Sequence, residues 1–118
     1  YTMVAPEHFE PIVEGMWRGV NVGGTSTMAR LDGWDVCGKT GTAQNPHGAD
    51  HSTFLSFAPK DNPKIAISVY VENGRWGASA ALPIASLLEE YYLTDTIRRP
   101  ALLEYVKNLK ISYPYYDK

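Results

Sequence analysis

Two neighbouring runs of the sequence have the composition of β-strands and are joined only by a short turn. They read STFLSFAP (52–59) and KIAISVYVE (64–72), and the turn sequence, PKDNP (59–63), suits a reversal of the chain. In the second run the β-branched side chains alternate onto one face: Ile65, Ile67, Val69 and Val71. Because the other face is also mostly apolar, we expect this strand to be central in its sheet and covered on both sides.

Apolar residues before these strands recur at spacings of three and four, which predicts one face of a helix. The helix should begin near His8, so that Pro11 falls in its first turn, and it should end near Gly23 and Gly24. The apolar face comprises Phe9, Ile12, Val13, Met16, Trp17 and Val20.

Two further helices are expected after the strands. Ser79 is a suitable N-cap for the first of them, and the second should start at Pro100 because proline favours the first turn of a helix. Residues 34–42 look extended, and residues 43–51 have the composition of a loop. We therefore expect an α+β fold, in which an antiparallel sheet of three strands is covered by helices.

Composition excludes several classes of function. The 118 residues carry a formal net charge of −2 and no basic run, which argues against a nucleic-acid partner. The only cysteine, Cys37, cannot form an internal disulfide and is expected to be a small buried strand residue. His47 and His51 lie near it in the sequence, but three possible ligands at loose spacing do not predict a metal site.

The stretch GWDVCGKTGTAQ (33–44) fits two incompatible motifs. From Gly33 to Thr40 it spells the phosphate-binding loop G-x-x-x-x-G-K-T, and from Lys39 it spells K-T-G, the last of three motifs in enzymes that acylate an active-site serine. A phosphate-binding loop requires a helix that starts at the Lys-Thr pair, whereas the following GTAQNP starts none. The K-T-G interpretation is therefore favoured over nucleotide binding.

The K-T-G motif needs a strand beside a cleft, with small residues that let a substrate backbone approach. Gly38 and Gly41 remove side chains on both sides of the Lys-Thr pair, and Thr42 adds a second hydroxyl. An exposed strand can bind a peptide by adding it as a further strand. A backbone amide there can also stabilise an oxyanion, an effect worth about 3 kcal/mol per donor.

Longer segments support this interpretation: EGMWRGVNVGGTSTMA, CGKTGTAQ, HSTFLSFAPKDNPKIAISVYVENG and WGASAALPIASLLEEYY. In order and spacing they resemble the C-terminal part of the transpeptidase domain of class B penicillin-binding proteins, and they are closest to the elongation-type members. The resemblance implies the penicillin-binding protein and β-lactamase-like transpeptidase fold. It also implies that residues 1–94 are the C-terminal portion of that domain and residues 95–118 a C-terminal helix and tail.

The resemblance further implies a reaction. In this family a serine attacks the D-Ala–D-Ala end of a peptidoglycan stem peptide, D-alanine leaves, and a neighbouring amine takes the acyl group; β-lactams acylate the same serine. By this resemblance Lys39 helps to organise protons and attracts the substrate carboxylate, which Thr40 hydrogen-bonds. Gly41 gives clearance, the backbone amide of Thr42 forms part of the oxyanion hole, and its hydroxyl is a further ligand contact.

The same resemblance implies that the parent protein is anchored in the bacterial inner membrane, faces the periplasm, works with a glycan polymerase and needs no cofactor. The sequence departs from the family at the nucleophile. The family requires a Ser-x-x-Lys and a Ser-x-Asn, and none of the serines in the chain is followed by lysine or asparagine at those spacings.

We therefore expect a C-terminal fragment that is catalytically inactive in isolation and that β-lactams do not acylate. The alternative is a non-catalytic scaffold or interaction module. Loss of the upstream part should expose apolar surface, so we also expect the fragment to self-associate through free strand edges or a swapped helix.

Overall fold

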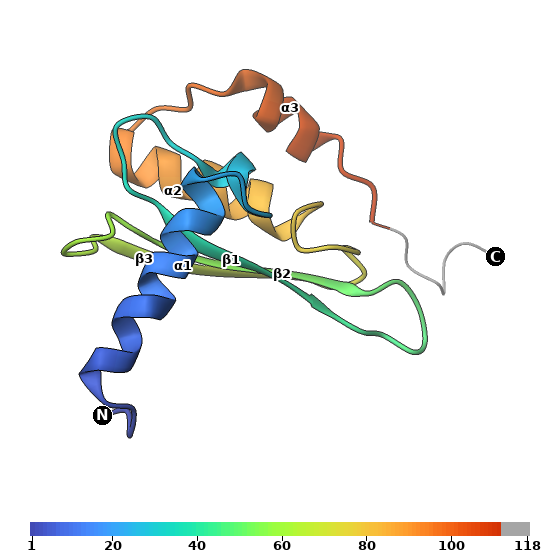
Figure 1. Ribbon diagram of the computed structural model, residues 1–118. Coiled ribbons are helices and arrows are strands. Elements are labelled where there is room, and N and C mark those ends of the chain that lie inside the picture. Colours follow the sequence, from blue (N-terminus) through green and yellow to red (C-terminus); the bar gives the residue numbers. More distant parts are fainter. Residues whose placement is uncertain (112–118) are drawn as a thin grey trace.

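A three-stranded antiparallel sheet forms the centre of the structure, with the strand order β1-β2-β3 (Figure 1). Strand β1 spans Cys37–Ala43, β2 spans His51–Ala58 and β3 spans Ile65–Val71. The structure is a computed structural model that describes residues 1–111, so the predicted C-terminal tail lies largely outside the described residues.

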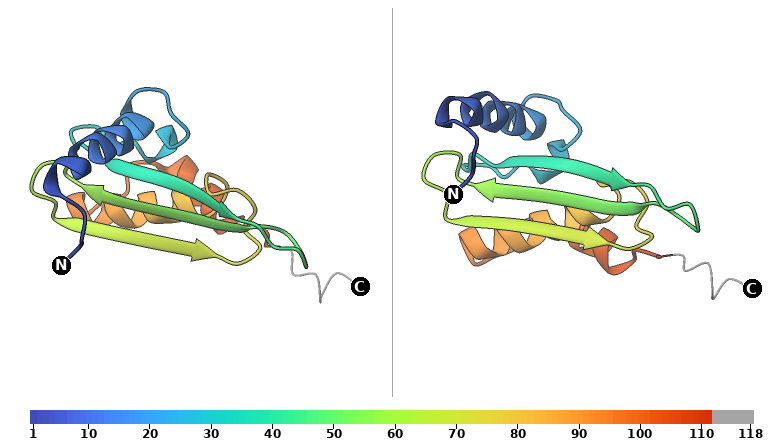
Figure 2. Two further views of the ribbon diagram at one scale, coloured as in Figure 1. Left: turned by 60° about the horizontal axis from the view of Figure 1, so that its bottom comes forward. Right: turned by 90° about the horizontal axis from the view of Figure 1, so that it is seen from below.

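Three α-helices pack around this sheet. Helix α1 (Phe9–Asn21) runs beside β1, and α2 (Ala81–Thr94) lies against one face of β2 and β3 (Figures 1 and 2). Helix α3 (Pro100–Lys107) packs on α2. Two short 3-10 turns, η1 (Pro6–His8) and η2 (Thr27–Ala29), precede and follow α1.

This order of one helix, three antiparallel strands and two helices confirms the predicted α+β fold. The first helix begins one residue after His8 and ends two residues before Gly23, and the third begins at Pro100 as predicted. In the described part of the chain, no helix is both long enough and apolar enough to span a membrane.

The prediction that the third strand is central was wrong. Within the described residues strand β3 lies at an edge of the sheet, because each strand pairs with the next in sequence and only β2 has two neighbours there. Its Ile67 and Val69 pack toward the core, whereas Ala66 and Tyr70 point to the opposite face and are exposed. The sequence prediction counted Ala66 and Tyr70 as buried apolar residues, so a strand that is covered on one face was expected to be covered on both.

The predicted N-cap of α2 was also wrong. Ser79 lies two residues before the helix, and the N-cap position belongs to Ala80, which has no side-chain hydrogen bond to offer. The amide of Ala81 instead donates to Oγ of Ser52 on β2, at 2.9 Å. The cap of this helix is therefore supplied by a strand that is distant in sequence.

The hydrophobic core lies between α1, the sheet and α2. Its largest members include Val20 on α1, Val36 before β1, Phe54 on β2 and Leu82 on α2, all almost completely buried. Asn21 joins the end of α1 to the start of β1, because its Nδ2 donates to the carbonyl oxygens of Trp17 and Val36, each at 2.9 Å. These contacts fix α1 against the first residues of β1.

A carboxyl group is buried within this core. Glu89 on α2 has no exposed surface; its Oε2 accepts a hydrogen bond from Ser56 Oγ at 3.0 Å, and its Oε1 has no partner among the described residues. Burial raises the pKa of Glu89 from its ordinary value of 4.5 to about 7, against the opposing effects of the Ser56 hydrogen bond and the Arg99 charge. A buried carboxylate with an unpaired oxygen destabilises the folded state.

The free energy of unfolding should therefore depend on pH through Glu89. Because the folded-state pKa is raised, the contribution of Glu89 is fully present below about pH 4.5 and is lost as the pH rises through about 7. A Glu89→Gln variant lacks this loss, so its stability relative to wild type should rise by about 3 kcal/mol between pH 4.5 and pH 8. Urea unfolding of both proteins across this range measures the difference; the same difference at every pH would contradict the prediction.

Packing around Gly38 generates a second prediction. A Cβ at Gly38 would lie 2.5 Å from Cζ of Phe54, whose ring is buried, and 3.4 Å from Cγ2 of Val20. Gly38→Ala should lower the free energy of unfolding by about 1–3 kcal/mol through overpacking. The matched control is Gly15→Ala within α1, where a Cβ meets nothing within 4 Å and should stabilise the helix by up to about 1 kcal/mol. Equal unfolding midpoints for Gly38→Ala and wild type would refute this account.

Candidate active site

The K-T-G residues lie in the middle of an edge strand. Lys39 to Thr42 all belong to β1, which pairs with β2 on one side only. The backbone continues as a strand to Ala43 and starts no helix after Thr40, so the backbone context of a phosphate-binding loop is absent from this stretch. The predicted extended edge is confirmed.

The register of the sheet divides these four residues between its two faces. Thr40 and Thr42 stand opposite the buried Phe54 and Ser52, on the side where α2 packs. Lys39 and Gly41 point to the other side, which we call the open face and which consists of Lys39, Gly41, Thr53, Leu55, Ser68 and Tyr70. Among the described residues no helix covers the open face (Figure 2), and Leu55 and Tyr70 are half exposed there.

The outer edge of β1 presents backbone groups that pair with no other strand in the described part of the chain. The ammonium group of Lys39 donates to the carbonyl oxygen of Thr40 at 2.7 Å, so this carbonyl points away from β2. The N–H and C=O of one strand residue point to the same side, and the direction alternates along the strand. We infer that Thr40 and Thr42 both direct their backbone groups outward, where an extended peptide could pair with them.

A turn after α1 brings a further hydroxyl to this edge. Oγ1 of Thr25 lies 3.3 Å from Oγ1 of Thr40. The turn can fold back on α1 because Gly24 lacks a side chain: a Cβ there would lie 2.5 Å from Cα of Gly19, and Ser26 N–H donates to the carbonyl of Gly19. Sequence reasoning did not place Thr25 in the site, although it lies in the Gly-Thr turn of the matching segment EGMWRGVNVGGTSTMA.

Gly41 leaves the open face clear at the motif. A Cβ at this position would lie 2.3 Å from Oγ1 of Thr53 on β2, so alanine would displace that side chain. Gly77, from the loop between β3 and α2, approaches the opposite side of the same residue and its N–H donates to Oγ1 of Thr42 at 3.4 Å. At Gly41, β1 thus carries no side chain on the open face, and the loop containing Gly77 packs against its other face.

The remaining candidates serve the fold. Cys37 is buried, as predicted, and burial raises the pKa of its thiol to about 11, which disfavours the reactive thiolate. Nδ1 of His51 accepts a hydrogen bond from the amide of Asn73 at 3.0 Å, and the imidazole lies beside the ring of Tyr70 in a tilted arrangement. Residues 1–111 contain no cluster of three side chains that could hold a metal ion.

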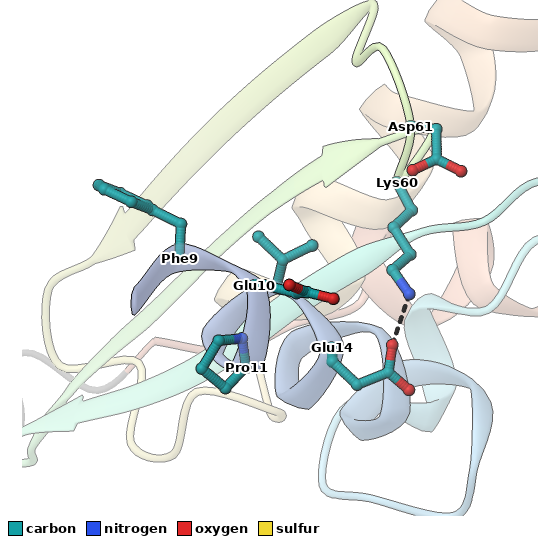
Figure 3. A pocket seen from close by; sticks show the side chains of 7 residues that line it. Phe9, Glu10, Pro11, Glu14, Lys60 and Asp61 are labelled. Atoms are coloured by element: carbon teal, nitrogen blue, oxygen red, sulfur yellow. Dashed lines mark hydrogen bonds and ion pairs between the residues drawn. The ribbon is translucent and has the colours of Figure 1, made fainter. Parts of the chain in front are cut away.

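A pocket of about 640 Å³ lies between the start of α1 and the turn after β2, and Lys39 to Thr42 do not line it (Figure 3). Two of its lining residues, Lys60 and Glu14, form an ion pair, and hydrogen bonds from Lys60 and Arg18 lower the pKa of Glu14. The pocket lies where α1 meets the turn after β2, and it is separate from the K-T-G motif.

Comparison with known proteins agrees with this geometry. Residues 2–88 match the family described as penicillin binding protein transpeptidase domain. The peptidoglycan D,D-transpeptidase MrdA of Haemophilus influenzae is 36% identical over 106 residues, which cover 75% of this chain and 16% of that protein. The MrdA protein of Acinetobacter baumannii is 37% identical over 92 residues, which cover 65% of this chain and 14% of that protein.

Solved structures show the same relationship. The structure of Pseudomonas aeruginosa PBP2 in complex with WCK 5153 matches with a TM-score of 0.61 and 28% identity, over 100% of this chain and 24% of that one. The imipenem acyl-enzyme complex of penicillin-binding protein A from M. tuberculosis matches with a TM-score of 0.61 and 30% identity, over 75% and 20% of the two chains. The chain therefore spans between 14% and 24% of the length of these proteins, and it belongs to the penicillin-binding protein transpeptidase family.

Proposed function

We propose that the chain is part of a peptidoglycan D,D-transpeptidase that cross-links stem peptides through a serine acyl-enzyme and is acylated by β-lactams. One observation carries the proposal: Lys39, Thr40 and Thr42 lie on a strand whose outer edge pairs with no other strand of residues 1–111. This edge can bind an extended peptide and its terminal carboxylate together.

The four motif residues receive distinct roles. Lys39 supplies positive charge for the D-Ala–D-Ala carboxylate and helps to organise protons, and Thr40 donates a hydrogen bond to the same carboxylate. Gly41 lets the peptide backbone approach the strand. The outward amide of Thr42 stabilises the oxyanion that forms when the serine attacks the carbonyl carbon, and its hydroxyl is a further contact for the ligand.

The nucleophile would come from another part of the parent protein, since the chain contains no Ser-x-x-Lys or Ser-x-Asn. Anchorage in the bacterial inner membrane, a periplasmic location and a glycan polymerase as partner complete the proposal, by analogy with the elongation-type members that the sequence resembles. They rest on that resemblance alone.

Labelling with fluorescent penicillin tests the function. The parent protein should form a covalent adduct, whereas the isolated chain should form none. In the parent, Lys39→Ala should slow adduct formation by about 10- to 100-fold, because a charged hydrogen bond to the carboxylate is lost. Lys107→Ala on α3 is the matched control and should label at the wild-type rate. An unlabelled parent, a labelled isolated chain or an unaffected Lys39→Ala variant would each contradict the proposal.

We also propose that the isolated chain associates with a second copy of itself. Both β1 and β3 are edge strands, and the open face exposes Leu55 and Tyr70. Sedimentation velocity at increasing concentration should show a dimer or larger species. Tyr70→Lys should shift the distribution toward monomer, because a charge on an edge strand opposes strand pairing. A wild-type monomer at high concentration would rule out this association.

A further inference from the structure

The loop of residues 72–80, which joins β3 to α2, is hydrogen-bonded to the sheet and its neighbouring loop at several points, and one of these bonds comes from a buried hydroxyl on β2. Oγ of Ser52, which has no exposed surface, lies 2.8 Å from the carbonyl oxygen of Trp76 and 3.2 Å from that of Gly77. The same oxygen accepts a hydrogen bond from the amide of Ala81 at 2.9 Å. A hydroxyl has one donor and two acceptor positions, so Ser52 fastens the loop with its proton and caps α2 with a lone pair.

The loop then meets β1 backbone to backbone. A Cβ at Gly77 would lie 2.6 Å from the carbonyl oxygens of Gly41 and Thr53 and 2.9 Å from the amide nitrogen of Gly41. No rotamer change can relieve such contacts, because all three of these neighbours are main-chain atoms of the sheet. Gly77 therefore rests directly on the peptide units that precede Thr42, and its N–H also reaches Oγ1 of Thr42.

We propose that Ser52 and Gly77 are positioning residues for the transpeptidase reaction, which act through β1 and do not touch the substrate. Ser52 holds the loop and Gly77 transmits its position to Gly41, so the pair fixes the direction of the Thr42 amide. This inference rests on the proposed function, in which that amide stabilises the oxyanion. An oxyanion donor must be placed to within a few tenths of an ångström, so a small shift of β1 lowers the reaction rate while the carboxylate contacts of Lys39 and Thr40 persist.

The test separates binding from chemistry in the full-length parent protein. For a chromogenic β-lactam, the acylation rate constant and the dissociation constant of the preceding non-covalent complex are measured for Ser52→Ala and for Gly77→Ala. Each variant should lower the acylation rate constant by about tenfold or more and change the dissociation constant by less than about threefold. Wild-type acylation by a folded Ser52→Ala variant would overturn the proposal; if Gly77→Ala does not fold, Ser52→Ala decides.

Ser56→Ala is the matched control, because Ser56 lies on the same strand and the same face and is equally buried, but its hydroxyl bonds to Glu89 of α2 and not to the loop. It should lower the melting temperature yet acylate within about twofold of wild type. A loss of acylation in Ser56→Ala equal to that in Ser52→Ala would show that general destabilisation, and not the loop, is responsible.

Hydrogen exchange provides a measurement that does not depend on activity. The amide of Gly41, which faces β2, should exchange faster in Ser52→Ala than in Ser56→Ala, because only the first variant loosens the loop that packs on Gly41. A wild-type parent that is not acylated would refute the proposed function. The exchange comparison would then be the test of whether Ser52 positions β1. Equal exchange in the two variants would overturn that positioning role.

Discussion

Close backbone packing around β1 is the constraint on which the rest of the structure depends. Gly38 faces the buried ring of Phe54, Gly41 faces Thr53, and Gly77 rests on the main chain of Gly41 from the other side. A side chain at any of these positions would move the strand or its neighbours. The glycines thus serve two purposes. They let α1 and the 72–80 loop pack closely against β1, and they leave the outer edge of β1 accessible to a peptide.

Polar groups buried between the sheet and α2 give this packing its specificity. Ser52 and Ser56 alternate with Phe54 on the covered face of β2; one hydroxyl caps α2 and the other bonds to Glu89. Buried hydrogen bonds of this kind contribute little net stability, but they penalise any arrangement that leaves them unmade. They therefore fix α2 in one position on the sheet, although Glu89 itself lowers stability at neutral pH.

Local patterns were sufficient to predict the elements and the open edge. The spacing of Phe9 to Val20 predicted α1, the composition around PKDNP predicted the hairpin, and the extended context of Lys39 excluded a phosphate-binding loop. The errors involved partners distant in sequence. Strand order decides whether Tyr70 is covered, and Ser52 replaced Ser79 as the cap of α2. Nothing near Thr25 or Gly77 in the sequence reveals that they meet Thr40 and Gly41, because these contacts form only when the whole sheet is assembled.

The central claim is that the outer edge of β1 receives the reacting acyl group. A crystal structure of the parent protein acylated by a β-lactam measures this directly, through the distance from the amide nitrogen of Thr42 to the acyl carbonyl oxygen. The account predicts about 2.7–3.1 Å, with the ligand carboxylate against Thr40 and Lys39. A carbonyl oxygen bound away from β1, or a ligand seated against β3 or in the pocket beside Lys60, would contradict it.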